Sequence, residues 1–457
     1  MARNTITGQN IIVMKTLPQE TKRHDKGLFV RQGSLYCRQT ATPPISVFFM
    51  TYIRRLSSFK DITAVQWRTL LATTLGWMLD AMDVMLYSFA LVAIQKEFAL
   101  SGTQSGLLTT VMLFSAALGG TLAGYLADRY GRTKVLMGSI LTYSLFTAAI
   151  ATATSFEQLL FWRALVGFGL GAEWSAGTVL VAESWPSQHR GKAMAITQSG
   201  WALGYILASL FAAAILPTYG WRPLFALGIL PALLTLWIRR AVPEPDVWSP
   251  TAARVPLSTL FRPPLGRYVL VSIAMSSLIL FAYWGLFTWV PAYLASPIEK
   301  GGAGLSVVRS TGWIIPMQLG ALAGYLSFGF LADRFGRRPV FVSFLFGAAI
   351  VTYLYGNLAQ SPGLLLALGP LVGFFGHGYY SAFGAILSEL FPSGIRATAQ
   401  GLCYNAGRVF SALAPAGIGA LADRQGIGAA LGMTAAFFAL GGLLIFGLPE
   451  TKGRELT

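Results

Sequence analysis

The chain has 457 residues, of which 54% are hydrophobic and 11% are charged, and its mean hydropathy is +0.58. Soluble domains carry about 25% charged residues, so this composition excludes a soluble globular protein and indicates a membrane protein with several spans. The formal net charge of +16 comes without a basic, aromatic-laced domain, which excludes a nucleic-acid-binding protein. Cys37, Cys403 and three histidines are too few and too scattered for a disulfide framework, a zinc or other metal site, or a redox site.

Residues 1–60 are polar and rich in Lys and Arg. They contain no apolar segment of the kind that a secretory signal needs, so we expect a basic, disordered cytoplasmic tail. One alternative is that the start codon is placed too early and the native protein begins at Met50. The other is that the tail is a basic arm held on the inner leaflet of the membrane.

Twelve continuously apolar runs follow this tail, each of about 20 residues and therefore long enough to cross a hydrocarbon core as a helix. Their continuous apolar character excludes the strands of a membrane barrel, in which apolar and polar residues alternate. The sequence therefore predicts an all-α membrane protein with twelve transmembrane helices. We place the helices near residues 67–95, 104–127, 135–154, 158–182, 191–216, 221–240, 267–294, 306–332, 339–358, 362–388, 396–421 and 426–447.

Several phrases occur twice, in the same order and 205 or 206 residues apart. Gly124–Lys134 reads GYLADRYGRTK and Gly329–Pro339 reads GFLADRFGRRP, while Pro243-Glu244 recurs as Pro449-Glu450. The chain therefore consists of two copies of one six-helix unit. We expect an N-terminal six-helix bundle at 61–240, a proline-rich cytoplasmic linker at 241–266 and a C-terminal six-helix bundle at 267–457.

Basic residues concentrate in the loops after the second, fourth, sixth, eighth and tenth spans, and the alternate loops hold few of them. By the positive-inside bias, both termini lie in the cytoplasm. We expect the spans to cross the inner membrane of a bacterium. Much of the positive charge then faces anionic lipid headgroups, which we expect as partners. We expect the protein to be a monomer.

The repeated loop phrase resembles the signature loop of the major facilitator superfamily, and both copies match it closely. Arg163–Gly171, which reads RALVGFGLG, is similar to the motif in the fourth span of that superfamily, and Pro449–Gly453 is similar to its ending. The resemblance extends from about residue 65 to the C-terminus. It implies two six-helix repeats with the superfamily's fold.

Other phrases resemble particular branches of the superfamily. Leu79–Asp83, which reads LDAMD, resembles the L-D-G-[FY]-D pattern of proton symporters for organic acids, with Ala81 in place of the glycine. Glu183–Pro186 and Tyr404–Arg408 are similar to the sialate and lactate symporters and their metabolite and aromatic-acid relatives. The resemblance implies a proton-coupled transporter of organic acids.

The resemblance also implies that charged residues around the repeated loops lock the cytoplasmic side while the site faces outward. The alternative is that the loops only anchor the topology and do not gate. The implied gating residues are Asp128, Arg132, Glu183 and Arg190 in the first half and Asp333, Arg337, Glu389 and Arg396 in the second.

Five charged residues lie inside predicted spans: Asp80, Asp83, Arg163, Glu173 and Arg408. Each Asp or Arg at a helix centre costs about 2.5–3.5 kcal/mol on insertion scales, so we expect pairing or a water-filled cavity near the midplane, where transporter sites form. Arg408 presents a fork that fits a carboxylate, although a structural ion pair is the alternative. Asp80 or Asp83 is the predicted proton carrier, with a static pair to Arg163 as the alternative and Glu173 as the rival carrier.

Aromatic residues are numerous at mid-span positions, and their polar tips suit the wall of a cavity for an organic molecule. Trp201, Tyr283, Trp284 and Tyr380 belong to this set, although at least half of it is expected to be core or interfacial belt. The residues predicted to bind substrate are Arg408, Arg163, Tyr404, Asn405, Trp289, Tyr205 and Tyr379.

The sequence thus predicts a secondary active transporter that imports a small organic acid with protons by alternating access. The acid is a monocarboxylate, a sialate or an aromatic acid, and the proton gradient is the driving force, with no cofactor and no metal.

A sugar or other metabolite porter is the alternative, suggested by Pro449–Gly453, but a neutral sugar has no use for Arg408. A drug antiporter is disfavoured because Gly200–Ala214 lacks that group's pattern. A non-transporting nutrient sensor is less consistent with short termini, and no nucleophile and base suggest an enzyme.

Overall fold

The computed structural model describes residues 62–244, 257–357, 361–391 and 396–452, and within these ranges the chain is helical and without strands. The expected tail at 1–60, residues 245–256 of the expected linker at 241–266, and residues 453–457 lie outside the described part, and what was expected of them stays a prediction.

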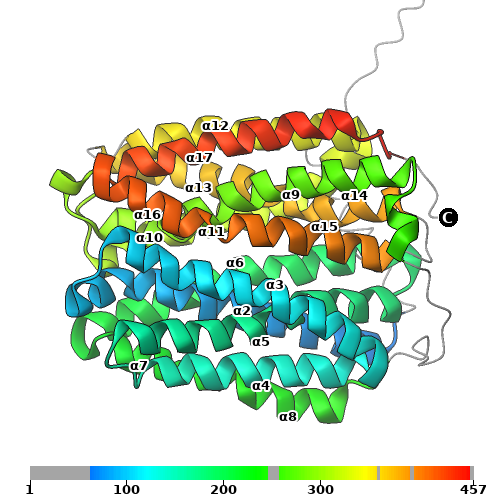
Figure 1. Cartoon of the computed structure of the whole chain (residues 1–457), viewed down its shortest axis with the longest axis horizontal. Helices are drawn as coiled ribbons and strands as arrows, with labels where there is room; N and C mark the ends of the chain where they lie inside the picture. Colours follow the sequence, from blue (N-terminus) through cyan, green and yellow to red (C-terminus); the bar gives the residue numbers. More distant parts are fainter. Residues whose placement is uncertain (1–61, 245–256, 358–360, 392–395, 453–457) are drawn as a thin grey trace, which may run out of the picture. The chain divides into compact units, whose positions relative to one another are not determined.

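The first half contains α2 to α8 and the second half α9 to α17 (Figure 1). The helices of the first half are α2 (Ala64–Phe98), α3 (Gly102–Tyr130), α4 (Arg132–Ile150), α5 (Phe156–Ser184), α6 (Ser187–Tyr219), α7 (Trp221–Ala226), the 3-10 helix η2 (Leu227–Ile229) and α8 (Leu230–Ala241). Those of the second half are η3 (Leu257–Phe261), α9 (Leu265–Phe287), α10 (Val290–Ala295), η4 (Ile298–Lys300), α11 (Val307–Phe335), α12 (Arg337–Asn357), α13 (Pro362–Gly378), α14 (Tyr380–Leu390), α15 (Arg396–Ser411), α16 (Ala414–Gln425), α17 (Ile427–Leu444) and η6 (Ile445–Gly447).

Each of the twelve predicted spans coincides with one helix or with consecutive helical segments, so the predicted all-α fold is confirmed. Within the described residues, seven spans qualify as membrane-crossing helices by length and apolar composition alone. Several of the others are divided into shorter segments. Four segments, α8, α10, α13 and α16, begin with a proline in their first turn, where the missing N–H group is not needed for a helical hydrogen bond.

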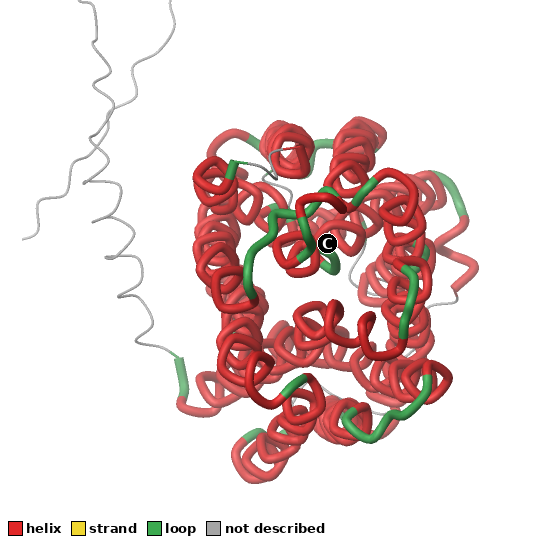
Figure 2. Tube along the Cα trace, turned by 90° about the vertical axis from the view of Figure 1, so that its left-hand side faces the viewer, coloured by secondary structure: helices red, strands yellow, loops and turns green. Residues whose placement is uncertain are grey.

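The helices run side by side along the long axis of the described part, and the two halves form adjacent groups (Figures 1 and 2). The end of the bundle with the connection between α2 and α3 is called the α2–α3 end here. The opposite end carries the repeated loops at 124–134 and 329–339 and is called the loop end.

Glycines set the closest helix contacts, and they do so at equivalent places in both halves. A Cβ atom on Gly167 of α5 would lie 2.0 Å from the carbonyl oxygen of Met112 in α3, and one on Gly373 of α13 would lie 1.7 Å from that of Met317 in α11. Such contacts leave no room for a side chain. Small residues of this kind let helices pack where lipid provides no hydrophobic drive between them.

The halves meet where α3 packs on α15 and α16, α6 packs on α11, and α2 packs on α10. Asp80 faces this boundary from the first half and Arg408 faces it from the second. A cation and a carboxylate from different halves thus face each other across the boundary.

Candidate functional site

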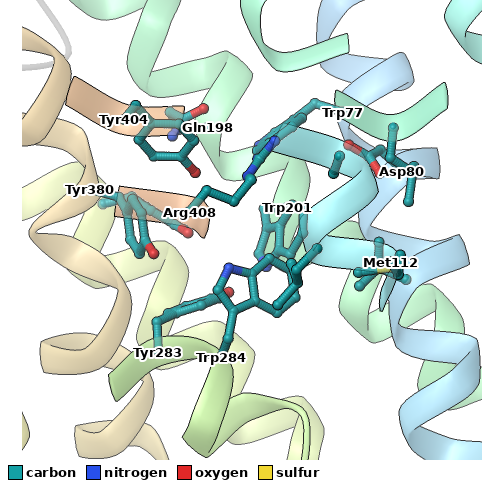
Figure 3. Close-up of a pocket in the computed structure, with 15 residues that line it drawn as sticks. Trp77, Asp80, Met112, Gln198, Trp201, Tyr283, Trp284, Tyr380, Tyr404 and Arg408 are labelled. Atoms are coloured by element: carbon teal, nitrogen blue, oxygen red, sulfur yellow. The ribbon is translucent and has the colours of Figure 1, made fainter. Parts of the chain in front are cut away.

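A pocket lies between the two halves and is called the central pocket (Figure 3). About 580 Å³ of space in it, including space open to solvent, is not filled by protein atoms. Helices α2, α3, α5 and α6 contribute to it from the first half, and α9, α11, α14 and α15 from the second. Its lining residues are Trp77, Asp80, Val84, Met112, Leu113, Ala116, Leu170, Gln198, Trp201, Tyr283, Trp284, Tyr325, Tyr380, Tyr404 and Arg408.

Arg408 is the cation of the central pocket. Only 6% of its surface is exposed, and its guanidinium carbon lies 5.0 Å from the ring centre of Tyr404. The side chain reaches from α15 across the pocket toward Trp77 and the side of α2 that carries Asp80 (Figure 3). No salt bridge within 4.0 Å joins Arg408 to Asp80, both of which are described residues, and the Nε atom of Arg408 has no hydrogen-bond partner. The guanidinium is thus available to an anion in the pocket.

The two aspartates of α2 differ in their position relative to the pocket. Asp80 lines it, whereas Asp83, nearly one turn further along the helix, lies behind the lining and is buried. Both carboxylate oxygens of Asp83 and the Oδ1 atom of Asp80 are buried without a hydrogen-bond partner in the described structure. Buried carboxylates in this condition are costly unless they gain a proton or a partner.

Arg163 does not line the central pocket, although it was predicted to bind substrate. Its Nε–H group donates a 3.4 Å hydrogen bond to the carbonyl oxygen of Leu108, and its guanidinium carbon lies 4.4 Å from the ring centre of Tyr87. Among the described residues it forms no ion pair within 4.0 Å with Asp80 or Asp83. The alternative of a static ion pair between Arg163 and an aspartate of α2 is therefore not seen.

Glu173 of α5 lines a second, smaller cavity that shares Trp77 and Gln198 with the central pocket. Both of its carboxylate oxygens are buried without a hydrogen-bond partner in the described structure. The carboxylate lies over Gly76 of α2, where an added Cβ would come within 2.3 Å of the Oε1 atom. Glu173 therefore lies next to the pocket, separated from it by Trp77 and Gln198.

Aromatic rings form a nearly continuous wall of the pocket. Trp201 lies between Trp77, with 4.9 Å between ring centres, and Trp284, with 6.0 Å. Tyr283 contacts Tyr380 edge to face at 5.1 Å. Such a wall offers flat apolar surfaces with polar edges, which suit a planar organic molecule.

Four other residues predicted to bind substrate do not line the pocket. The hydroxyl of Tyr205 donates a 3.2 Å hydrogen bond to the carbonyl oxygen of Phe287. The indole N–H of Trp289 donates a 3.0 Å bond to the carbonyl oxygen of Pro415. Tyr379 stacks on Tyr380 with 4.7 Å between ring centres, and Asn405 packs near Gly120 of α3. Of the residues predicted to bind substrate, Arg408 and Tyr404 therefore line the central pocket and the others do not.

Besides five apolar side chains, three polar or aromatic lining residues were not identified from the sequence. Trp77 lies three residues before Asp80 and therefore on the same face of α2, which could have indicated its role. Gln198 is an amide in an otherwise apolar span, and a buried amide needs hydrogen-bond partners. This could have indicated that its side chain faces a polar cavity. Tyr325 lies just before the repeated loop of the second half, and nothing in its sequence neighbourhood distinguishes it from a packing residue.

The predicted gating residues are described only in part. Arg337 and Glu389 form an ion pair with 3.2 Å between Nη2 and Oε1, and the hydroxyl of Thr451 donates a 2.5 Å bond to the Oε2 atom of Glu389. The Arg132 side chain is half-buried at the loop end. The side chains of Asp128, Glu183, Arg190, Asp333 and Arg396 lie outside the described part, and their gating role stays a prediction.

The repeated Pro-Glu phrase has a structural task that the sequence did not reveal. Glu244 accepts hydrogen bonds from the backbone N–H groups of Thr133 and Lys134 at the start of α4, at 3.1 and 3.2 Å. Glu450 accepts bonds from the backbone N–H groups of Arg337 and Arg338, the first two residues of α12, at 2.9 and 3.0 Å. Each carboxylate therefore caps the helix that follows the signature loop of its own half.

Comparisons with known proteins agree with this architecture. A sequence model of the Major Facilitator Superfamily matches residues 73–317 and 308–457. A probable 4-methylmuconolactone transporter of Cupriavidus pinatubonensis is 36% identical over 410 residues, which cover 86% of this chain and 93% of the relative. The cis,cis-muconate transport protein of Acinetobacter baylyi is 34% identical over 80% of this chain and 90% of its own length. A crystal structure of a D-xylose-proton symporter has the same fold, with a TM-score of 0.70 and 22% identity over 86% of this chain and all of its own.

Proposed function

This chain belongs to the major facilitator superfamily and is a multi-pass membrane transporter, and we propose that it imports a small, planar organic acid together with protons. The observation that carries the proposal is Arg408, a buried guanidinium that faces the central pocket without a salt bridge to Asp80 and is surrounded by aromatic rings. The cycle is alternating access, with both termini in the cytoplasm of a bacterium.

Arg408 supports an anionic substrate. A guanidinium binds a carboxylate through two parallel N–H donors and keeps its charge at any working pH. A buried cation without a carboxylate partner is costly, and the carboxylate of an organic anion would supply that partner. A neutral sugar would leave that charge unpaired, which is why we rank a sugar porter second.

The walls support a flat substrate. Trp77, Trp201 and Trp284 present ring surfaces to the pocket, while Gln198 and the tyrosine hydroxyls are its main uncharged polar groups. An unsaturated or aromatic acid matches this surface better than a sialate does, because a sialate carries many hydroxyls that would need partners. The names of the two muconate-type relatives agree with this class.

Asp80 supports proton coupling. It lines the same pocket as Arg408, so a substrate carboxylate on Arg408 and a charged Asp80 would lie in one low-dielectric space. Like charges disfavour each other there. Loading of the anion therefore goes with protonation of Asp80, and the proton leaves when the pocket opens to water on the other side. Asp83 and Glu173 are rival or relay carriers.

The test is uptake into proteoliposomes with a panel of labelled compounds: cis,cis-muconate, benzoate, nicotinate, lactate, N-acetylneuraminate and xylose. We expect accumulation of the planar acids when the outside is acidic, and its loss when an ionophore collapses the gradient. Liposomes with Arg408→Ala protein serve as the control for the site. Accumulation of xylose, or uptake that ignores the proton gradient, would contradict the proposal.

A further inference from the structure

A third copy of the signature phrase lies at the opposite end of the bundle. Gly419–Gly426 reads GALADRQG, which matches the G-x-L-A-D-R-x-G core of Gly124–Gly131 and Gly329–Gly336. The resemblance extends to conformation. The last glycine of each copy ends a helix with a positive φ, of 111°, 102° and 86°, and donates its N–H to the carbonyl oxygen of the alanine four residues earlier. Because α16 runs toward the α2–α3 end, this third corner lies there and not at the loop end.

The aspartate of this third copy binds the other half of the protein. Asp423 of α16 accepts a 2.8 Å hydrogen bond from the N–H of Gly102 and a 3.1 Å bond from the N–H of Thr103, at the start of α3. The hydroxyl of Thr103 adds a bond of 3.2 Å. The pairing joins residues more than three hundred positions apart, across the boundary between the halves.

Asp423 provides the hydrogen-bond acceptor for two backbone N–H groups at the start of α3. The first N–H groups of a helix have no partner within the helix. The Ser101 hydroxyl accepts from the N–H of Gln104 at 3.1 Å, and Ser105 already bonds to the Ser101 carbonyl. The two remaining donors, on Gly102 and Thr103, are those that Asp423 occupies. The carboxylate also lies at the positive end of the α3 dipole, so the second half completes the cap of a helix in the first.

Close backbone contacts accompany the cap. A Cβ on Gly419 of α16 would lie 2.2 Å from the carbonyl oxygen of Gly102, and one on Gly106 of α3 would lie 2.2 Å from that of Pro415. Two further hydrogen bonds join the halves between the pocket and this end. The hydroxyls of Thr311 and Tyr205 donate to the carbonyl oxygens of Ser209 and Phe287. In the described part, the α2–α3 end is therefore closed by direct contact of the two halves.

We propose that Asp423 is a latch that holds the α2–α3 end closed, and that it must release α3 each time the central pocket opens there. The inference rests on the alternating-access cycle proposed above. Shifted by the repeat offset of 206, Asp423 corresponds to Pro217, which has no carboxylate. The first half therefore has no counterpart of this aspartate at the equivalent position, and the latch comes from the second half alone.

The test measures the opening of that end without reference to any substrate. Spin labels are placed on the exposed positions Lys96 of α2 and Arg309 of α11, in a background without Cys37 and Cys403, and the distance between labels is measured by double electron–electron resonance. Asp423→Ala is expected to raise the ratio of open to closed molecules about three- to fivefold, in keeping with the loss of an N-cap acceptor. The matched control is Arg424→Ala, an exposed neighbour for which the structure gives no hydrogen bond or ion pair, and it should leave the distances unchanged.

A second variant opens the same end by a different route. Gly419→Ala inserts a methyl group against the carbonyl of Gly102 and should also shift the distances toward the open form. A single cooperative melting transition in both variants, lowered by no more than the loss of one helix cap, shows that they still fold. If neither Asp423→Ala nor Gly419→Ala changes the distances, the latch is wrong, whatever the transport assays give. If the distances shift but wild-type protein moves no organic acid, the latch stands and the proposed substrate class fails.

Discussion

The guanidinium of Arg408 lies over the ring of Tyr404, four residues earlier on α15, with 5.0 Å between the guanidinium carbon and the ring centre. The guanidinium packs on the face of the Tyr404 ring through a cation–π contact, and its N–H groups remain directed into the central pocket. Tyr404 and Arg408 therefore act together, one as support and the other as anion-binding group.

The first prediction concerns this cation. Arg408→Lys keeps the charge but loses the planar fork, so the Kd for a planar acid should rise about 10-fold. Arg408→Ala removes the charge and should raise it about 30-fold or more, the size expected when one partner of a buried charge pair is lost. Binding is measured by calorimetry on purified protein. Unchanged Kd values in both variants, for every acid tested, would remove Arg408 from the binding site.

The second prediction separates the two aspartates of α2. Asp80 lines the pocket and Asp83 does not, so Asp80→Asn should abolish gradient-driven accumulation while exchange of labelled for unlabelled substrate continues. A permanently neutral side chain still permits loading of the anion but cannot carry a proton across. Asp83→Asn is the matched control on the same helix and should retain part of the accumulation. If both variants accumulate substrate like the wild type, Glu173 becomes the leading proton carrier.

The third prediction compares an aromatic residue inside the pocket with one behind it. Trp201→Phe removes ring surface between Trp77 and Trp284, and KM for an aromatic acid should rise by roughly 3- to 10-fold, because aromatic pairs contribute about 0.5–1.5 kcal/mol beyond their burial. Tyr379→Phe removes a hydroxyl that has no hydrogen-bond partner in the described structure and should leave KM within twofold. Initial uptake rates across a range of substrate concentrations give both values. The opposite ranking would mean that the pocket is not the binding site.

The fourth prediction concerns the helix caps at the loop end. Glu450→Gln replaces a carboxylate that caps α12 with a group that has one acceptor, and the free energy of unfolding should fall by about 1 kcal/mol. Thermal melting in detergent measures the change. Glu244→Gln removes the equivalent cap of α4 and should have a similar or smaller effect. Equal melting of both variants and the wild type would show that the caps do not stabilise the protein.

The stabilisation that the Glu450 cap gives to the fold should depend on pH. Burial alone would raise the pKa of Glu450, but the backbone N–H groups of Arg338, Arg337, Lys452 and Thr451 outweigh it and lower the pKa below its ordinary value of 4.5. A group whose pKa is lower in the folded state stabilises the fold at pH values above 4.5 and loses that contribution as the pH falls through its folded pKa. The melting difference between Glu450→Gln and the wild type should therefore be full at neutral pH and shrink in acid.

Much of the fold followed from local properties of the sequence. The length and continuous apolar character of each run decide whether a segment crosses a bilayer as a helix, so the twelve spans could be placed without knowledge of their neighbours. The doubled loop phrase identified the repeat in the same way. The sequence indicates less clearly where a span is divided into shorter segments, such as α9 and α10. A proline is tolerated both in the first turn of a new helix and at a kink within one helix, so its presence does not tell the two apart.

The site depended on information that the sequence alone does not contain. Burial inside a span marked Asp80, Asp83, Arg163, Glu173 and Arg408 as unusual, because a charge in an apolar helix is costly wherever the helix packs. Which of them face one cavity is decided by the rotation of each helix about its axis, and that rotation is set by packing against the other half. Tertiary structure therefore assigned Asp80 and Arg408 to the pocket, directed Arg163 to Tyr87 and the carbonyl of Leu108, and brought Asp423 to the start of α3, a contact between distant parts of the chain that no local pattern could reveal.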